Sequence, residues 1–231
     1  MRLFTKLYNK FIKKIEKVVV FKPSINIKTI YLGSSYGGWH VVSDYLNSES
    51  IIYSLGIGKD ITFDEECMKL FNCKIYAFDP TEATMEFLKV KKVNPNFKFF
   101  PYAISNENKL ANFYPPRQND YVSHTLETDI HASSTRPVKK VQVKTLSTIM
   151  KELGHMKIDV LKCDIEGTEY KVLDSILKDN IYIKQLCIEF HHQFEKYSRF
   201  KTKKMIKQLE HNNYRLVQVK SNTDFLFLKI D

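Results

Sequence analysis

Short apolar runs alternate with segments of helical spacing along most of the chain. Seven of these runs have the length and composition of strands, and they are residues 51–55, 74–78, 97–100, 158–162, 185–190, 214–219 and 225–230. Apolar periodicity predicts helices between them, over residues 62–70, 82–92, 169–177 and 205–210. Strands that alternate with helices build a mostly parallel sheet covered on both faces. We therefore expect one α/β domain, closed by an antiparallel pair formed from the last two strands.

The first 22 residues are predicted to form an amphipathic helix. Apolar side chains repeat at helical spacing, and five lysines fall on the other side. Pro23 ends this helix at or before Lys22, because the residue before a proline is displaced from helical geometry. The apolar stripe either packs on the main domain or a partner subunit, as in a homodimer, or lies on an anionic membrane surface. We accordingly divide the chain into residues 1–27, the helix with its connector, and residues 28–231, the main domain.

The formal charge of +10 is concentrated in two places. Residues 1–22 carry +6 and residues 195–207 carry +5, so the rest of the chain has a charge of −1. This distribution argues against bulk nucleic-acid binding and favours local contact with an anionic surface or substrate. The four cysteines show neither a C-x-x-C pair nor zinc-ligand spacing, which favours free thiols in a reducing compartment. We expect a cytoplasmic protein, peripheral to the membrane if the helix binds there.

A glycine pair follows the first predicted strand of the sheet. The order strand, Gly56-Ile57-Gly58, Asp60 and helix lets the backbone approach a bound ligand closely. Ile61 stands where a dinucleotide-binding loop needs a third glycine, which disfavours a pyrophosphate and leaves a nucleoside-bearing cofactor. Asp79 ends the next strand, where a carboxylate can accept hydrogen bonds from ribose hydroxyls. The alternative for Asp79 is a turn or helix cap before Pro80.

Two further pairs of polar residues follow predicted strands. Asp164 and Glu166 come after residues 158–162 and point to the same side of an extended chain, as paired carboxylates do in acid–base sites or around a divalent ion. Their alternative is a strand-end turn with a helix cap. His191 and His192 end the fifth strand, where a histidine can deprotonate a hydroxyl near neutral pH. Adjacent strand residues face opposite ways, so we expect one of the two to line the site, and chelation of one metal by this pair alone is disfavoured.

Five motifs, in this order along the chain, resemble those of S-adenosylmethionine-dependent methyltransferases of the FkbM type. They are the glycine loop, Ala77–Pro80, Tyr102–Ser105, Asp164–Gly167 and Ile188–His191. The resemblance runs from about Tyr36 to the C-terminus. It implies a class I methyltransferase domain over residues 28–231, with a Rossmann-like, mostly parallel seven-stranded sheet, and S-adenosylmethionine as cofactor. Members of this family O-methylate sugars or other hydroxyl-bearing small molecules.

The resemblance also implies a role for each position that would face the cofactor. These positions are Gly56 and Gly58 at the methionine part, with Asp60 of the same loop, Asp79 at the ribose, Ala103 and Ile104 at the adenine, and Asp164 near the sulfonium. We expect in-line methyl transfer to an acceptor hydroxyl, for which the protein aligns the nucleophile and excludes water. His191 is the candidate base, with Asp164 as its orienting partner or as the alternative base. Glu166 serves either of them, or binds a divalent ion together with Asp164.

The acceptor side is predicted to come from two segments. Trp39, the only tryptophan, follows two glycines upstream of the first strand and is either an aromatic flap over the pocket or part of the core. Residues 115–137, which include His131, break the strand–helix rhythm in a long loop that is either functional or disordered. The candidate acceptor-binding residues are Tyr36, Trp39, His124, Arg136 and His192.

Two other classes of protein compete with this interpretation. One is an NAD-dependent oxidoreductase, which the missing third glycine and the order of the motifs disfavour. The other is a non-catalytic or nucleic-acid-associated protein that keeps the fold. The basic patches permit it, but the sequence has no aromatic-plus-basic recognition motif, so we expect no specific nucleic acid. The expected partner is a small-molecule or glycan acceptor.

Overall fold

The computed structural model of the chain describes residues 19–118, 123–128, 132–133, 135–194 and 197–230. The amphipathic helix predicted over residues 1–22 therefore lies almost entirely outside the described residues. Residues 19–22 have no helical structure. They lie against the main domain, because Val19 and Phe21 are buried in its core and the backbone N–H of Ser24 donates to the carbonyl oxygen of Leu216 over 2.7 Å.

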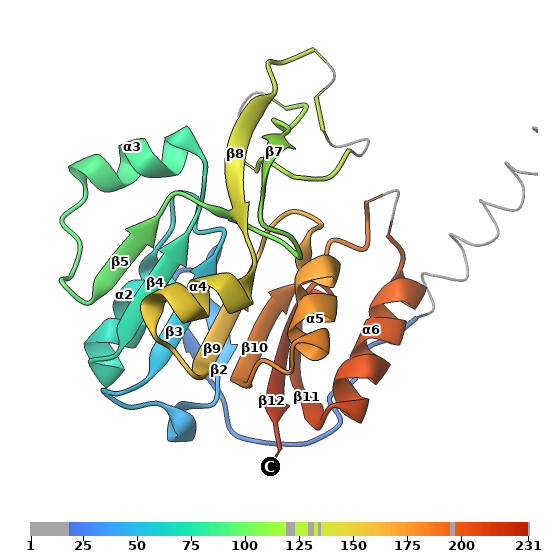
Figure 1. Ribbon diagram of the computed structural model, residues 1–231. Coiled ribbons are helices and arrows are strands. Elements are labelled where there is room, and N and C mark those ends of the chain that lie inside the picture. Colours follow the sequence, from blue (N-terminus) through green and yellow to red (C-terminus); the bar gives the residue numbers. More distant parts are fainter. Residues whose placement is uncertain (1–18, 119–122, 129–131, 134, 195–196, 231) are drawn as a thin grey trace, which may run out of the picture.

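A seven-stranded sheet forms the centre of the molecule (Figure 1). Its strands, in spatial order, are β11 (Tyr214–Lys220), β12 (Asp224–Lys229), β10 (Ile183–Glu189), β9 (Ile158–Cys163), β3 (Ile51–Leu55), β4 (Lys74–Phe78) and β5 (Phe97–Phe100). The neighbours from β10 to β5 are parallel, and β12 runs antiparallel to both β10 and β11. The structure confirms the seven predicted strands and the closing antiparallel pair.

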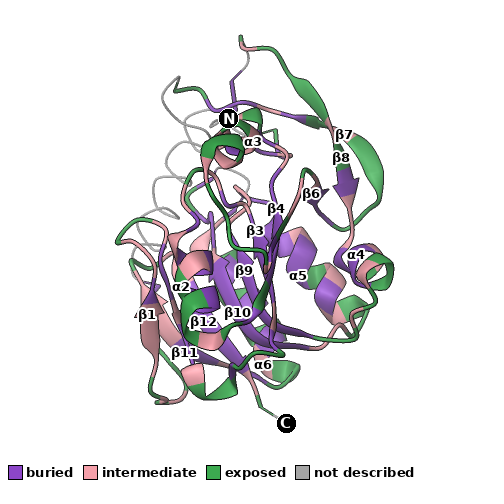
Figure 2. Ribbon diagram, turned by 90° about the vertical axis from the view of Figure 1, so that its left-hand side faces the viewer, coloured by how far each residue is buried: buried purple, intermediate pink, exposed green. Residues whose placement is uncertain are grey.

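Two hydrophobic layers lie on opposite faces of this sheet (Figures 1 and 2). Alternate residues of β3 divide between them, with Tyr53 and Leu55 in one layer and Ile52 in the other. The first layer is covered by α4 (Leu146–Leu153), α5 (Glu169–Lys178) and α6 (Arg199–His211). The second is covered by α2 (Thr62–Phe71) and by the hairpin of β1 (Ile30–Leu32) and β2 (Trp39–Val41). Helix α3 (Glu82–Val90) follows β4.

Helix α6 begins earlier than the periodicity predicts. Ser198 caps its first turn, because the Ser198 hydroxyl oxygen accepts a hydrogen bond from the backbone N–H of Lys201 over 3.2 Å. The buried side of the helix carries Thr202 and Met205, while cations occupy most of the exposed side. The first turn is rich in cations and has few apolar residues, so apolar spacing did not indicate that the helix begins there.

The sequence did not predict a second, three-stranded sheet or helix α4. The small sheet has the order β6 (Ala103–Ile104), β8 (Lys139–Lys144) and β7 (Lys109–Phe113), and it rises beyond the central sheet at the top of Figure 1. Its strands β7 and β8 are rich in Lys, Asn and Gln and mostly exposed, so they lack the apolar signal of a buried strand. The 3-10 turn at Ser43–Tyr45 was also not predicted.

The described part of the 115–137 segment is irregular but anchored at several points. Isolated bridges pair Tyr114 with Thr125 and Pro116 with Ala132. Strands β7 and β8 hold the two ends of the segment side by side. Within the described ranges, no helix combines the length and apolar composition needed to cross a bilayer.

Candidate active site

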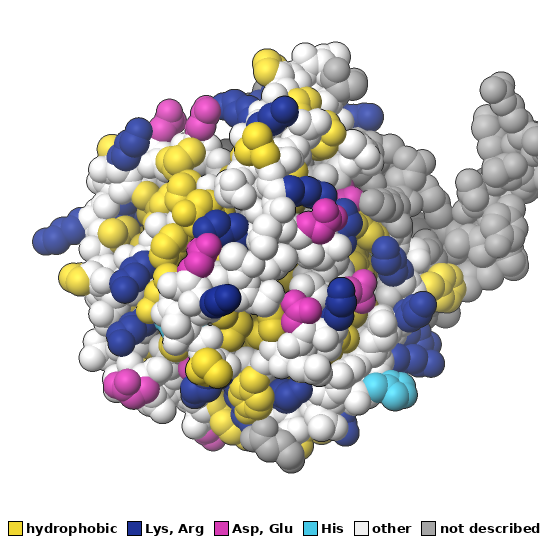
Figure 3. Space-filling model, viewed as in Figure 1, with side chains coloured by type: hydrophobic (Ala, Val, Ile, Leu, Met, Phe, Trp, Pro, Cys, Tyr) yellow, Lys and Arg dark blue, Asp and Glu magenta, His cyan; other side chains and the backbone are white. Residues whose placement is uncertain are grey.

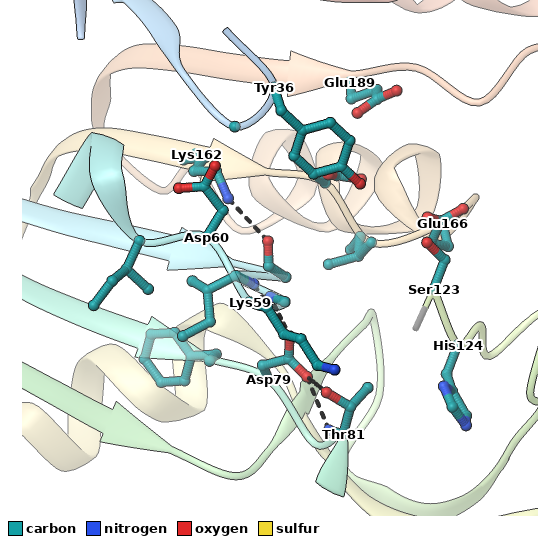
Figure 4. Close-up of a pocket in the computed structure, with 18 of the residues that line it drawn as sticks. Tyr36, Lys59, Asp60, Asp79, Thr81, Ser123, His124, Lys162, Glu166 and Glu189 are labelled. Atoms are coloured by element: carbon teal, nitrogen blue, oxygen red, sulfur yellow. Dashed lines mark hydrogen bonds between the residues drawn. The ribbon is translucent and has the colours of Figure 1, made fainter. Parts of the chain in front are cut away.

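A cavity of about 900 Å³ opens at the carboxyl ends of β3, β4, β9 and β10 (Figure 4). This is the edge at which ligands bind in open parallel sheets, and its volume is in the range of small-molecule sites. Loops from both sides complete the wall, namely the β1–β2 hairpin and the segment between β7 and β8. The sequence predicted the location correctly.

The glycine loop after β3 packs directly on the end of β9. Gly56 has a φ of +72°, and a Cβ atom on it would lie 1.8 Å from the carbonyl oxygen of Asp164, so only glycine fits here. Gly58 has a φ of +54°, but a Cβ atom there would meet no described atom within 4 Å. Gly56 is therefore required for the close packing of the loop on β9, whereas Gly58 leaves open space at the cavity wall.

Asp79 joins the glycine loop to the start of α3. One carboxylate oxygen accepts hydrogen bonds from the backbone N–H groups of Ile57 and Gly58, at 3.2 and 2.9 Å. The other accepts from the backbone N–H and the hydroxyl of Thr81, at 2.8 and 2.7 Å. Asp79 lines the cavity, and with these four bonds it holds the loop in shape. Its predicted contact with a ribose stays a prediction.

Asp60 fixes the position of the hairpin loop above the cavity. Its carboxylate accepts hydrogen bonds from the Ser34 hydroxyl at 2.5 Å and from the Thr62 N–H and hydroxyl at 2.9 and 2.6 Å. Burial alone would raise the pKa of Asp60, but the bonds from Ser34 and Thr62 outweigh it and the pKa lies below its usual value. The Ser34 hydroxyl oxygen in turn accepts from the backbone N–H of Gly37 over 2.8 Å, which secures the turn beside Tyr36.

The two aromatic residues of this hairpin occupy different environments. Tyr36 is 89% exposed, and its ring points into the cavity on the side of Glu166 and Glu189 (Figure 4). Partial burial raises the pKa of the Tyr36 phenol, and the charges of Asp164, Glu166 and Glu189 raise it further. Trp39 lies in β2, is buried, and belongs to the hydrophobic layer while also lining the cavity. Tyr36 is therefore the exposed aromatic group at the mouth of the site.

An apolar wall closes the end of the cavity nearest β4. Phe78, Tyr102, Ala103 and Ile104 line it, and the Phe78 and Phe100 rings are stacked with centroids 5.2 Å apart. A flat, mostly apolar wall of this kind is suited to a heteroaromatic base. The structure thus brings both residues predicted for the adenine into the cavity.

Carboxylates gather at the other end of the cavity. Asp164 and Glu166 follow β9, Glu189 ends β10, and all three line the wall. Glu166 has a φ of +51°, which is uncommon for a residue other than glycine. Its carbonyl oxygen accepts a hydrogen bond from the Thr125 hydroxyl over 2.6 Å. The turn after β9 is therefore held in an unusual conformation that directs a carboxylate into the site.

His191 lies directly behind these carboxylates. Its Nδ1 is 2.8 Å from Oε1 of Glu169, and its Nε2 is 3.2 Å from Oε2 of Glu166 and 3.8 Å from Oδ1 of Asp164. The imidazole is 3% exposed and is not among the described residues that line the cavity. Burial alone would lower the pKa of His191, but Glu169 and Glu166 raise it well above its usual value. His191 is therefore a donor between two carboxylates, and its predicted role as base stays a prediction.

The acidic cluster also changes the protonation of Asp164. Burial raises the pKa of this carboxyl well above its usual range, and the charges of Glu189 and Glu166 add to the rise. The positive charges of His191 and Lys162 oppose it. Burial likewise raises the pKa of Glu189. Carboxyl groups with raised pKa values at a cavity edge are typical of sites that move protons.

The structure separates the predicted acceptor-binding residues into two groups. His124 lines the cavity, with its ring stacked on Phe113 at 5.2 Å between centroids. Arg136 is not brought to the cavity, because its Nη1 donates to the carbonyl oxygen of Pro116 over 2.9 Å. His131 lies outside the described residues.

His192 is also not brought to the cavity. Its ring is buried 5.9 Å from that of Phe21, with Nδ1 3.4 Å from the Thr202 hydroxyl. Burial lowers the pKa of His192 to about 4, and the charges of Arg199 and His191 add to the effect. As expected for adjacent strand residues, the two histidines face different surroundings. His191 contacts the acidic cluster, and His192 packs among core residues on the side of α6.

Sequence reasoning missed three residues of the site. Lys162 is buried within β9, and its ammonium donates to the carbonyl oxygen of Gly56 over 2.9 Å. Glu169 is buried at the start of α5, and Glu189 lines the cavity. A lysine inside an otherwise apolar strand, a third acid after the Asp164–Gly167 turn and a carboxylate at a strand end are the signals that could have found them.

Together, the sheet order, the glycine loop, the apolar wall and the acids at the carboxyl edge define a methyltransferase domain of class I, which uses S-adenosylmethionine. The chain belongs to the FkbM methyltransferase family, since the model of the Methyltransferase FkbM domain matches residues 54–216. This membership leaves the NAD-dependent oxidoreductase alternative without support.

Curated relatives are distant and longer. Probable methyltransferase-like protein 24 of Homo sapiens is 28% identical over 147 residues, which cover 63% of this chain and 33% of that protein. The protein of the same name from Rattus norvegicus is 26% identical over 221 residues, covering 90% of this chain and 53% of that protein. The chain thus spans between a third and about half of the length of these relatives.

The solved structures that match this chain are also distant. Fibrillarin of Aeropyrum pernix, crystallised with natively bound S-adenosyl-L-methionine, has a TM-score of 0.42 and 12% identity over 80% of this chain and 68% of that one. A methyltransferase from Pyrococcus furiosus has a TM-score of 0.41 and 13% identity over 97% of this chain and 98% of that one.

The residues of the cavity fit S-adenosylmethionine. The apolar wall is suited to the adenine, the open space beside Gly58 admits a ligand close to the backbone, and the carboxylates at the far end complement a sulfonium cation. The site therefore accommodates the cofactor that the family requires.

Proposed function

We propose that this domain is an O-methyltransferase that acts on a hydroxyl of a sugar, a glycan or another small molecule. The observation that carries the proposal is the group of carboxylates, Asp164, Glu166 and Glu189, on the cavity wall between the glycine loop and the exposed ring of Tyr36. A hydroxyl nucleophile needs a proton acceptor at the point where it meets the methyl group. A neutral or cationic surface at this position would not provide one.

The cofactor, when bound, supplies an electrophilic methyl group. The chain's own residues then have to align an acceptor with it and exclude water. Tyr36 from the hairpin and His124 from the 115–137 segment line the same cavity, one from either side of the acidic cluster. A sugar ring can stack its apolar face on Tyr36 while its hydroxyls reach polar groups on the opposite wall.

Asp164 is the residue that we propose to accept the hydroxyl proton, as one of the two base candidates indicated by the sequence. Its carboxylate lines the cavity with a third of the side chain exposed, whereas His191 is enclosed behind it. His191 is hydrogen-bonded to Glu166 and Glu169, and its Nε2 lies 3.8 Å from the Asp164 carboxylate. His191 is thus a positioning residue in this proposal.

The test begins with cofactor binding and continues with methyl transfer. Isothermal titration calorimetry with S-adenosylmethionine should give one site per chain. Tritiated cofactor, offered with pools of monosaccharides, glycans and hydroxyl-bearing small molecules, should label at least one pool, and NMR of the product should place the new methyl group on oxygen. A methylated nitrogen or carbon in the product would refute the O-methyl assignment.

Matched variants locate the base. Asp164→Asn should lower kcat by about 10²–10⁴-fold without loss of the fold. Asp174→Asn, which changes an exposed carboxylate on α5, should leave kcat unchanged. Equal turnover in wild type and Asp164→Asn would remove Asp164 from the mechanism.

We further propose that the protein works at an anionic membrane surface. The exposed side of α6 carries Lys201, Lys203, Lys204 and Lys207, and Lys and Arg side chains gather at this edge in Figure 3. Arg199 at the start of the same helix donates to the carbonyl oxygen of Val19 over 3.1 Å, so the basic sequence that precedes Val19 joins the domain beside this patch. Adjacent cations together with an apolar stripe in sequence favour binding to acidic lipids.

Vesicle flotation tests this proposal. The full chain should float with vesicles of phosphatidylglycerol and phosphatidylcholine but not with phosphatidylcholine alone. A triple change of Lys203, Lys204 and Lys207 to Gln should reduce flotation. A triple change of Lys69 on α2, Lys89 in the last turn of α3 and Lys92 just after α3 to Gln should not. Equal flotation of the two triple variants would contradict the proposal.

A further inference from the structure

A buried threonine of α3 is bonded to the second glycine of the loop after β3. The hydroxyl of Thr84 donates to the carbonyl oxygen of Gly58 over 2.8 Å, and 26 positions separate the two residues in the sequence. Gly58 lines the cavity, whereas Thr84 is fully buried and does not belong to the described part of the cavity wall. The Gly58 carbonyl is therefore turned toward a side chain that lies behind the wall.

The backbone of Gly58 is held at both of its polar groups. Its N–H donates to Oδ2 of Asp79 over 2.9 Å, and its carbonyl oxygen accepts from Thr84. With a φ of +54°, Gly58 lies in the left-handed region, and a glycine can leave this region for others at little steric cost. The two hydrogen bonds select one conformation among those that glycine allows.

Thr81 joins these two attachments into a closed ring of hydrogen bonds. Its hydroxyl donates to Oδ1 of Asp79 and to the Thr84 hydroxyl oxygen, both at 2.7 Å, so one hydrogen is shared between two acceptors (the bond to Asp79 is drawn in Figure 4). The hydrogen of Thr84 then serves the Gly58 carbonyl. All three side chains of the ring are buried. Buried networks in which each member is bonded are rigid, so the ring fixes the loop.

The ring also sets the direction of the next peptide group. Because a peptide is planar and trans, the N–H of Lys59 points opposite to the Gly58 carbonyl and hence away from Thr84. Lys59 lines the cavity, and no described residue accepts a hydrogen bond from its N–H. A backbone donor in the wall of a cavity is suited to an oxygen atom of a ligand. The methionine part of S-adenosylmethionine, which we expect beside this loop, carries a carboxylate.

We propose that Thr84 is a positioning residue for the cofactor. By holding the Gly58 carbonyl, its hydroxyl directs the N–H of Lys59 at the carboxylate of the methionine part. Thr84 itself touches no ligand in this proposal and acts through one peptide group. The inference rests on S-adenosylmethionine as cofactor and on the predicted contact of the glycine loop with its methionine part. It does not rest on the nature of the acceptor.

A matched pair of ligands tests the proposal. S-Adenosylhomocysteine and 5′-methylthioadenosine share the adenosine and a thioether, but only the first has the amino-acid part with its carboxylate. Thr84→Val keeps the shape of the side chain and removes the hydroxyl. Calorimetry should show about tenfold weaker binding of S-adenosylhomocysteine to this variant, because the Gly58 carbonyl loses its donor and its peptide can turn. Binding of 5′-methylthioadenosine should be unchanged, and Thr84→Ser should bind both ligands as wild type does.

Thr202→Val is the control for the loss of a buried hydroxyl. Thr202 is a fully buried residue of α6, and its hydroxyl lies 2.7 Å from that of Tyr170. This variant should lose stability in urea about as Thr84→Val does, but it should bind both ligands normally. Circular dichroism shows whether each variant is folded. If Thr84→Val does not fold, Thr84→Ala removes the same hydroxyl without the second methyl group and replaces it in the titrations.

Three outcomes overturn the role of Thr84. They are normal binding of S-adenosylhomocysteine without the hydroxyl, an equal loss for both ligands, and a serine variant that binds as weakly as the valine variant. An equal loss would mean that Thr84 supports the whole site and not the end that holds the carboxylate. These titrations contain no acceptor, so their failure leaves the proposed methyl transfer intact. Absence of methyl transfer to every acceptor, with the expected ligand pattern, would reject the proposed function alone.

Discussion

The ammonium group of Lys162 donates a hydrogen bond to the carbonyl oxygen of Gly56 over 2.9 Å. This bond crosses from the middle strand β9 to the loop that follows β3, and Gly56 also packs on the backbone of Asp164. These two contacts fix the glycine loop and the acidic turn after β9 to each other. The charge of Lys162 also opposes the pKa rises of Asp64 and Asp164 that burial causes.

Replacing Lys162 by Met should loosen this connection. The carbonyl oxygen of Gly56 loses its donor, at a cost of about 1–3 kcal/mol in the free energy of unfolding, and the affinity for S-adenosylmethionine should fall. Urea unfolding and calorimetry measure the two effects. Lys184→Met, which changes a buried lysine of β10 over the ring of Tyr45, should leave the cofactor affinity unchanged. The same loss of affinity in both variants would show that Lys162 has no special role.

The two glycines of the loop should respond differently to alanine. Gly56→Ala combines left-handed strain with a clash against the Asp164 carbonyl and should cost at least about 3 kcal/mol in stability. Gly58→Ala carries strain alone, about 1–2 kcal/mol, so the fold should survive while the added methyl group obstructs the cofactor. Thermal unfolding and cofactor titration of both variants check this. A stable, cofactor-binding Gly56→Ala protein would contradict the packing described above.

Asp79→Asn should impair cofactor binding more than its small change in shape suggests. The amide nitrogen cannot accept the two hydrogen bonds that one carboxylate oxygen now receives, whichever way the side chain is turned. We expect a loss of about 1–3 kcal/mol in the free energy of unfolding and at least tenfold weaker binding of S-adenosylmethionine, roughly the effect of 1.4 kcal/mol. Calorimetry of this variant against Asp159→Asn, whose carboxylate bonds the backbone of Ile51, is the comparison. Similar affinities would mean that Asp79 does not order the loop.

Asp64 should make stability depend on pH. Burial raises its pKa to about 6, and the hydroxyl of Ser54 donates to one of its oxygens. The unfolded chain has the lower pKa, so the folded protein binds more protons between about pH 4 and 6. The free energy of unfolding therefore decreases as the pH rises through this range, by up to about 3 kcal/mol from this group.

Asp64→Asn removes this dependence. The variant should become more stable relative to wild type as the pH increases from 4 to 7, as measured by urea unfolding at a series of pH values. A constant difference between the two proteins over this range would be inconsistent with a protonated, buried Asp64.

Tyr36→Ala should affect the acceptor and not the cofactor. The exposed ring lies at the mouth of the cavity, on the side of Glu166 and Glu189. With an acceptor found by tritium labelling, KM should rise by about tenfold, the equivalent of 1.4 kcal/mol, at an unchanged affinity for S-adenosylmethionine. Tyr45→Ala, which removes a half-exposed ring beside Lys184, should leave KM unchanged. An effect on cofactor affinity alone would assign Tyr36 to the other ligand.

The central sheet could be predicted because apolar residues predominate in its strands. Residues 51–55 and 158–162 have no competing interpretation, and the polar residues after them mark the functional edge. The small sheet could not be predicted, since β7 and β8 are solvent-exposed and their pairing depends on contacts distant in sequence. The sequence therefore indicated the edge of the sheet at which the cavity opens and left the segment between β7 and β8 largely undetermined.

Within the site, the sequence could not predict how the side chains are oriented. The sequence did indicate that three polar residues lie close together, because each follows or ends a strand. They are Asp164, Glu166 and His191. The position of His191 behind the carboxylates depends on Glu169, two residues beyond the Asp164–Gly167 turn, and on the left-handed conformation of Glu166. Neither can be inferred from spacing, because a helix start and a left-handed turn both depart from the alternation of an extended strand.

The hydrogen bond from Thr125 to Glu166 ends on a carbonyl oxygen and not on a side chain. This bond attaches the segment between β7 and β8 to the turn after β9. It uses the Thr125 hydroxyl on the side of the segment and, on the side of the turn, a backbone group that every residue type possesses. Side chains elsewhere in this segment are free to diversify without disturbing that attachment. Under the proposed function, the acceptor preference could therefore change through substitutions in this one segment while the glycine loop and the central sheet stay as they are.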